Sequence, residues 1–203
     1  QWHYQNKGNY AFVTERAEAI AGSDVNCVEA WKSCKGDPSI IVAVLDEGVM
    51  WSHPDLKANM WTNESEEIGS TEDKDGNGYK GDRYGYNFVK NTGVISWTSA
   101  EDTGHGTHVA GTIAAVNGNG TGVSGIAGGD GTENSGVKIM TCQLFDGQYG
   151  ATLAAEAKAI KYAADNGAVI LQCSWGYNSP DANEALGYVP GPKNEQDWEN
   201  QYP

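Results

Sequence analysis

Residues 39–45 read Ser-Ile-Ile-Val-Ala-Val-Leu, and this run decides the class of fold. It is almost continuously apolar and β-branched, without the alternation of polar and apolar residues that marks a half-buried strand. Such a run is typical of a strand buried on both faces, as strands of parallel sheets are. The run ends at Asp46-Glu47-Gly48 and therefore predicts a buried strand with an acidic carboxyl end.

Two further apolar runs, at 137–145 and 168–174, predict strands of the same sheet. Helical patterns occupy 104–116 and 152–166, between these strands. The order strand, helix, strand, helix, strand argues for an α/β fold, in which helices flank a mostly parallel sheet in three layers.

Local signals predict where two helices begin and which face one of them buries. Asn26 followed by Glu29 has the spacing of a capping box and predicts a short helix over 28–34. In the longer helix at 152–166, helical spacing predicts one buried face. That face comprises Leu153, Ala157, Ile160 and Ala164.

Composition excludes several classes of function. Among 203 residues, 13 Lys and Arg stand against 27 Asp and Glu, a formal net charge of −14. Nucleic-acid binding needs a basic surface, so this balance argues against it. No stretch approaches the ~20 apolar residues of a membrane-spanning helix.

The four cysteines have no metal-binding spacing. Cys27 and Cys34 lie seven residues apart, so a disulfide between them is possible. Cys142 and Cys173 fall in apolar runs and are predicted to be reduced thiols of the core.

Asp46 and His105 are candidate catalytic residues. A carboxylate at the carboxyl end of a buried strand lies where ligands gather in open α/β sheets, and it could orient a histidine. The alternative is a simple Asp-x-Gly turn. His105 and His108 could instead form a metal pair on one helix face, but too few other ligands are near them in the sequence.

Residues 73–78 read Asp-Lys-Asp-Gly-Asn-Gly, in which Asp73, Asp75 and Asn77 alternate as oxygen ligands of calcium loops do. The twelfth position from Asp73 is Tyr84 instead of the Glu of an EF-hand. The segment therefore predicts a single calcium loop, with an acidic, solvated turn as the alternative.

Four blocks in this order resemble the subtilisin-like serine protease family (subtilases). They are the Val-Ala-Val-Leu-Asp-Glu-Gly-Val block at 42–49, His-Pro-Asp-Leu at 53–56, His-Gly-Thr-His-Val-Ala-Gly-Thr-Ile-Ala at 105–114 and Gly-Val-Ser-Gly-Ile-Ala-Gly at 122–128. The resemblance implies an Asp-His-Ser triad in which Asp46 orients His105, the general base. Glu47 departs from the family, which more often has Ser or Thr there.

The resemblance also implies how a peptide substrate and calcium bind. Ser174, Trp175 and Gly176 match the substrate-binding segment, to which an extended peptide would add as a strand. Gly147 to Gly150 resembles the opposite binding edge. Asp55 matches a carboxylate of the family's tight calcium site, together with the loop at 117–123. No organic cofactor is implied.

The family's Gly-Thr-Ser motif, which carries the catalytic serine, is absent from these residues. We therefore expect a serine endopeptidase whose serine lies on a missing or separate C-terminal part, so that this chain alone is inactive. Residues 1–25 would be an N-terminal arm, 26–176 the N-terminal portion of the catalytic domain and 177–203 a polar insertion ending at a nick or truncation. The resemblance implies a protein that is secreted or located in the cell envelope. The alternative function is that of a non-catalytic, peptide-binding pseudoprotease.

Overall fold

The computed structural model describes residues 1–9, 19–98, 101–176, 180 and 192–201. It divides into two compact units, Gln1–Cys173 and Ser174–Pro203. In the second unit, the helix α5 spans Glu195–Gln201. The first unit contains the sheet and both predicted catalytic residues.

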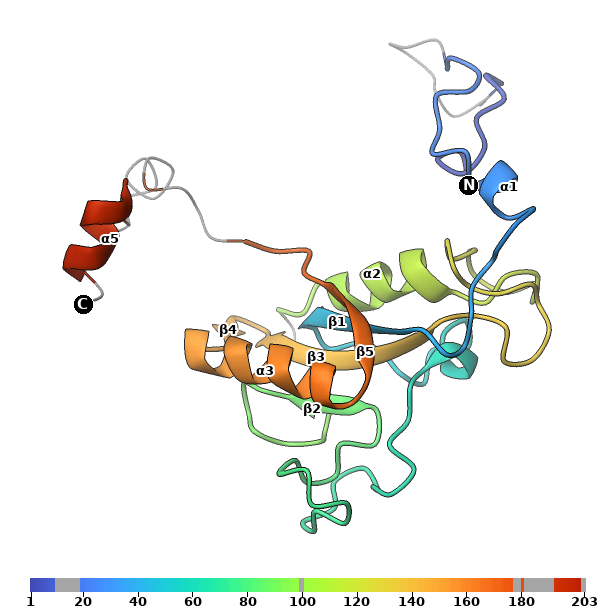
Figure 1. Cartoon of the computed structure of the whole chain (residues 1–203). Coiled ribbons are helices and arrows are strands. Elements are labelled where there is room, and N and C mark those ends of the chain that lie inside the picture. Colours follow the sequence, from blue (N-terminus) through green and yellow to red (C-terminus); the bar gives the residue numbers. More distant parts are fainter. Residues whose placement is uncertain (10–18, 99–100, 177–179, 181–191, 202–203) are drawn as a thin grey trace. The chain divides into compact units, whose positions relative to one another are not determined.

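The first unit is built around a mostly parallel sheet, as the sequence predicts (Figure 1). Its strands lie in the order β2-β3-β1-β5, and each neighbouring pair is parallel. The short strand β4 pairs antiparallel with the end of β3. The strands are β1 (Ile41–Glu47), β2 (Gly85–Asn87), β3 (Lys138–Asp146), β4 (Tyr149–Gly150) and β5 (Ala168–Gln172).

The two longer helices of this unit, α2 (His105–Ala114) and α3 (Leu153–Asp165), lie on opposite sides of the sheet in Figure 1. α2 packs its small residues Ala110 and Ala114 against a core that includes Val42 and Val44 of β1. Two short elements precede β2, namely α1 (Cys27–Ala30) and the 3-10 helix η1 (Lys57–Asn59). Within the described residues, no helix has the length and hydropathy needed to cross a membrane.

β1 is buried as its apolar sequence predicts, but β5 is not. Val169 and Ile170 of β5 are 64% and 49% exposed, and they lie where the pairing of β5 with β1 shifts by one residue. The reason is position, since β5 forms one border of the sheet and pairs with β1 alone among the described strands.

The predicted buried face of α3 is also wrong. Leu153 and Ile160 are 60% and 50% exposed, whereas the helix buries Ala159, Tyr162 and Ala163. Tyr162 fixes this orientation, because its hydroxyl donates a hydrogen bond of 2.8 Å to the buried carboxylate of Asp82.

The predicted capping box does not form. Asn26 has a left-handed backbone and makes no side-chain hydrogen bond to α1, which is shorter than expected. The cysteines are all free, so the possible Cys27–Cys34 disulfide is absent. Cys142 is buried as predicted, and burial raises the pKa of its thiol, whereas Cys173 is exposed.

Candidate active site

Asp46 lies at the carboxyl end of β1, and its side chain is held by two hydrogen bonds to one oxygen. The residue is 1% exposed. Its Oδ1 atom accepts from the main-chain N–H of Glu47 at 2.7 Å and contacts Nδ1 of His105 at 2.7 Å. Its Oδ2 atom is buried and has no partner among the described residues. The carboxylate is therefore fixed in place and aimed at the histidine.

His105 is the first residue of α2, and its imidazole remains accessible. The side chain is 47% exposed, against 2% for that of Asp46. A buried carboxylate hydrogen-bonded to Nδ1 keeps an imidazole in the tautomer whose Nε2 can accept a proton. The pair Asp46–His105 therefore has the arrangement of a general base and the carboxylate that orients it.

Gly106 allows the start of α2 to approach the end of β1. A Cβ atom at this position would collide with the main-chain oxygen of Glu47. Only glycine leaves room for this approach, which brings His105 within reach of Asp46.

Residues on the loop beyond β3 border the same end of the sheet. The N–H of Gly147 donates to Asp102 at 2.8 Å, and Gly150 pairs with Phe145 across the β3–β4 hairpin. Both glycines are thus close to the carboxyl end of β3. Their predicted role as a substrate-binding edge stays a prediction, as does that of Ser174, Trp175 and Gly176, which belong to the second unit.

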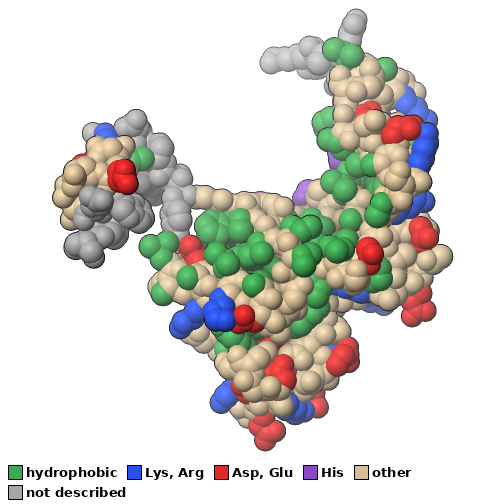
Figure 2. All heavy atoms as spheres, in the orientation of Figure 1, with side chains coloured by type: hydrophobic (Ala, Val, Ile, Leu, Met, Phe, Trp, Pro, Cys, Tyr) green, Lys and Arg blue, Asp and Glu red, His purple; other side chains and the backbone are tan. Residues whose placement is uncertain are grey.

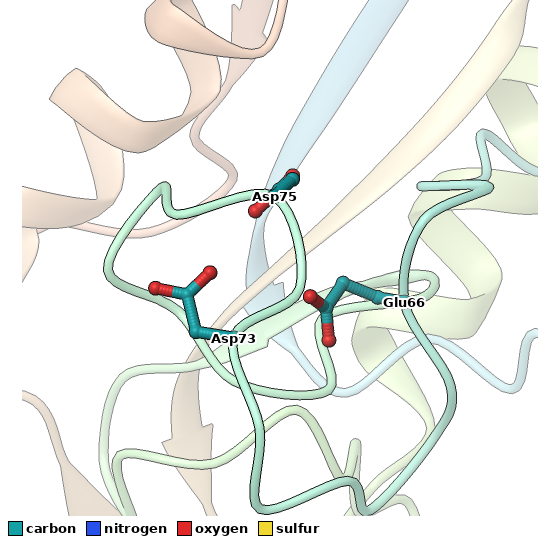
Figure 3. A group of neighbouring side chains, drawn as sticks. All are labelled: Glu66, Asp73 and Asp75. Carbon is teal, nitrogen blue, oxygen red and sulfur yellow. The ribbon is translucent and has the colours of Figure 1, made fainter.

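The segment that was predicted to bind calcium forms an acidic loop with a residue that sequence spacing missed. Glu66, Asp73 and Asp75 each offer an oxygen, and these oxygens lie within 4.8 Å of one another (Figure 3). Glu66 is 1% exposed and accepts from the main-chain N–H groups of Lys74 and Gly81. Glu66 lies seven residues before Asp73 in the sequence, outside the alternating motif, so the motif spacing does not predict that it joins the loop.

Asn77 lies in the same loop but binds through its amide to other carboxylates. Its Nδ2 donates to Asp75 at 3.3 Å and to Asp82 at 3.0 Å. Burial raises the pKa of Asp82, although hydrogen bonds from Asn77 and Tyr162 oppose that effect. For Asp73, main-chain hydrogen bonds, above all from Gly78, lower the pKa.

Asp55 is 1% exposed and is enclosed by the 117–123 loop, as the resemblance implies. Its Oδ1 accepts from Nδ2 of Asn119 at 2.7 Å, and its Oδ2 accepts from the N–H of Val123 at 2.8 Å. A Cβ atom at Gly122 would collide with Oδ2. Gln1 reaches this loop as well, because its Oε1 accepts from the N–H of Ser124 at 2.7 Å.

The alternative metal pair finds no support in the part of the chain that the structure describes. Neither His105 nor His108 joins a group of three or more metal-binding side chains there. His108 is exposed, and it borders a cavity of about 510 Å³ together with His3 and His53.

Comparisons with known proteins bear on the family and the fold of the chain. The chain is 33% identical over 159 residues to a halolysin-like extracellular serine protease of Natrialba magadii, and 34% identical over 154 residues to subtilisin-like protease 1 of Plasmodium berghei. These matches cover 78% and 75% of this chain but 25% and 22% of those proteins. The chain therefore spans about a quarter of the length of these curated relatives.

Solved structures share the fold. A serine protease of Aeromonas sobria, solved in complex with a chaperone, matches with a TM-score of 0.64 and 24% identity over 89% of this chain and 25% of its own. A protease of Pseudoalteromonas arctica matches with a TM-score of 0.54 and 24% identity over 92% of this chain and 52% of its own. The model of the subtilase family of peptidases matches residues 37–198. With its sheet, its Asp46–His105 pair and this match, the chain belongs to the subtilase family.

Proposed function

We propose that this chain supplies the aspartate and histidine of a serine endopeptidase, whose serine lies on a C-terminal part of the protease. The observation that carries the proposal is the 2.7 Å contact between Oδ1 of Asp46 and Nδ1 of His105. Asp46 is buried, so its carboxylate is fixed in place, and His105 is accessible, so its imidazole can meet a serine and a substrate. Hydrolysis of a peptide bond by this pair requires both.

In the proposed reaction, His105 moves a proton twice. It first takes the proton of the serine hydroxyl, which then attacks the carbonyl carbon of the peptide bond. It next gives that proton to the leaving amine, and in the second half of the cycle it activates water in the same way. Asp46 stays ionised throughout, keeps the ring in its orientation and stabilises the imidazolium.

The exposed border of the sheet at β5 is evidence that a further polypeptide segment packs there. Val169 and Ile170 are exposed apolar residues on a strand that pairs with β1 alone among the described strands. A strand at the border of a sheet can accept a further strand. We infer that the remainder of the protease adds beside β5 and brings the serine to His105, which is consistent with the quarter of the relatives' length that this chain spans.

The substrate we propose is a peptide or protein segment bound in extended form. We propose Ser174, Trp175 and Gly176 as residues that bind the extended peptide, and Gly147 to Gly150 likewise. The Natrialba magadii relative is named an extracellular protease, and we propose that this protein also acts outside the cytoplasm.

Calcium is the metal we propose, as a structural ion at two places. At the first, Asp55 is a buried carboxylate that contacts only neutral donors among the described residues, and Gly122 allows the main chain to approach its Oδ2 closely. Oxygen ligands could come from Asp55, Gln1 and Asn119. At the second, Glu66, Asp73 and Asp75 offer three carboxylates, a donor set that suits a hard cation. Bound calcium would offset the repulsion among these carboxylates.

Serine-directed labelling tests the proposed activity. We expect a fluorophosphonate probe to label one serine of the purified protease, and mass spectrometry to place it on polypeptide beyond this chain. A variant His105→Ala should abolish labelling, whereas the matched variant His108→Ala should retain it. Absence of label from the folded, complete wild-type protein would refute the proposal and favour a peptide-binding pseudoprotease.

Chelation tests the proposed calcium. We expect removal of calcium to lower the melting temperature of the wild-type protein. The variants Asp55→Asn and Asp73→Asn should each shrink the effect of chelation, while Asp130→Asn, in an exposed loop, should not. If chelation does not change the melting temperature of the wild-type protein, the proposal that it binds structural calcium is refuted.

A further inference from the structure

Glu47, the last residue of β1, joins that strand to the start of α2. One carboxylate accepts hydrogen bonds from the N–H of Thr103 at 3.2 Å, from the hydroxyl of Thr103 at 3.1 Å and from the N–H of His105 at 3.0 Å. Glu47 and Thr103 are 56 residues apart in the sequence, so this connection is a tertiary one. The glutamate thus holds the main chain of the proposed general base.

The start of α2 has no cap of its own. Its N-cap residue is Gly104, which has a left-handed backbone with φ 77° and no side chain to accept a hydrogen bond. The first turn of the helix contains no acidic residue. Helix starts expose N–H groups and carry a partial positive charge, and both are normally satisfied by a nearby side-chain oxygen or carboxylate. Glu47 supplies both from another element.

β1 ends at Glu47, where its pairing with β3 becomes irregular. Asp46 lies opposite Gln143 and Glu47 opposite Phe145, so the extra residue of this irregularity is Leu144 of β3. Asp46 and Glu47 nevertheless both contact the first residue of α2, Asp46 at the ring of His105 and Glu47 at its main-chain N–H.

His105 is consequently held at two points by two consecutive acidic residues. Asp46 contacts its ring at Nδ1, and Glu47 accepts from its main-chain N–H. We propose that Glu47 is a positioning residue, which fixes the main chain of His105 so that the imidazole meets Asp46 and, in the complete protease, the serine. This inference rests on the proposed function, in which His105 is the general base.

The test compares variants of the complete protease after titration of its active sites. Glu47→Gln removes the charge and replaces one acceptor oxygen by a donor, whereas Glu47→Asp keeps the charge on a shorter arm. Glu133→Gln removes the same charge from an exposed loop and is the matched control. Each is assayed on a neutral and on a basic peptide, well below its melting temperature, and its rate of labelling by a fluorophosphonate is measured.

We expect Glu47→Gln to lower kcat on the order of tenfold to a hundredfold for both peptides, with KM little changed, because misplacement of a reacting group acts on the chemical step. The labelling rate should fall in parallel, Glu47→Asp should recover part of the loss, and Glu133→Gln should match the wild type. Should Glu47→Gln fail to fold, Thr103→Val removes one of the three hydrogen bonds, and its smaller loss of kcat decides the question.

Two results would overturn the inference. An unchanged kcat alongside a lower melting temperature would show that Glu47 only stabilises α2. A rise in KM confined to the basic peptide would show that its charge acts on the substrate. If the wild type itself is not labelled, the proposed function fails, and the NMR signal of the proton between Nδ1 of His105 and Asp46 still tests Glu47. That signal should persist in Glu133→Gln and be lost in Glu47→Gln, and its persistence in both would refute the positioning role.

Discussion

Tyr162→Phe tests the hydrogen bond that joins α3 to Asp82, in the acidic loop that contains Asp73 and Asp75. The substitution deletes one oxygen atom and leaves the buried ring in place. Tyr162 and Asp82 are both 0% exposed, and the hydroxyl donates to Oδ2 of Asp82 at 2.8 Å. Because both groups are buried, water would not replace the lost hydrogen bond. The same burial raises the pKa of the tyrosine and that of the aspartate. Loss of this hydrogen bond should therefore destabilise the folded protein.

The magnitude follows from what remains around Asp82. A hydrogen bond to a charged group contributes about 1.5–3 kcal/mol to the free energy of unfolding. Asp82 retains two amide donors, Asn77 on Oδ2 and Asn63 on Oδ1, each at 3.0 Å. We therefore expect the lower part of that range, about 1.5–2 kcal/mol. For a protein of this size the melting temperature should fall by about 3–8 °C.

Urea denaturation with a serine protease inhibitor present measures this loss directly. The midpoint should move to lower urea while the slope stays the same, because the same surface is exposed on unfolding. Tyr149→Phe is the matched control, since Tyr149 is 64% exposed and its variant should change stability by less than about 0.5 kcal/mol. Equal stabilities of the two variants would refute the role assigned to the Tyr162 hydroxyl.

Three further predictions concern the catalytic pair, the Asp55 loop and one exposed aspartate. Asp46→Asn should lower kcat on the order of 10⁴-fold in the complete protease, because the amide favours the wrong tautomer of the histidine. The assay normalises kcat by a titration of active sites, and an unchanged kcat would contradict this prediction. Gly122→Ala should destabilise the protein by about 1–3 kcal/mol, since its φ of 57° is strained for alanine and the new Cβ would collide with Asp55; calorimetry that finds no loss would contradict it. Hydrogen bonds from the Thr132 hydroxyl, and then from its N–H, lower the pKa of Asp130 to about 2, so NMR should find a rise towards 3.8 in Thr132→Val. Because this pKa is lowered in the folded state, the stabilisation is present above the unfolded value and is lost as the pH falls from about 4 towards 2, and an unchanged titration would sink the assignment.

The central strands and the contact between Asp46 and His105 could be predicted because their signals are local. β1 begins with a continuous apolar run, Ile41 to Leu45, and β3 is mostly apolar between Ile139 and Phe145; burial on both faces is what such segments favour. Asp46 follows the first run directly, and His105 opens a helix whose residues match a specific family block. The 2.7 Å contact between them then follows from the fold that these blocks imply.

Other elements could not be predicted because tertiary contacts decide them. β2 contains three residues, Gly85 to Asn87, and has no apolar run, so its strand depends on pairing with β3. The buried face of α3 depends on Tyr162, whose partner Asp82 is 80 residues away in the sequence. Spacing alone placed the more apolar side inward, which is the side that carries Ile160.

The candidate sites show the same limit. Glu66 joins Asp73 and Asp75 through main-chain hydrogen bonds that fold the loop back on itself, and no motif spacing records that. The sequence showed Glu47 as a departure from the family without a reason for it. Its hydrogen bonds to Thr103 and to the uncapped start of α2 become visible only when strand and helix are brought together.

The exposed border at β5 also has a consequence for the kinetics of folding. A ribosome adds about 5–20 residues each second, so a polypeptide that continues beyond this chain would present β5 for seconds before its neighbouring strand is made. Val169 and Ile170 are exposed apolar residues of that border. Figure 2 shows hydrophobic side chains gathered on the face of the first unit that it presents. During this interval the strand can pair with β5 of another nascent molecule as readily as with its own continuation. Yield on refolding should therefore depend steeply on protein concentration.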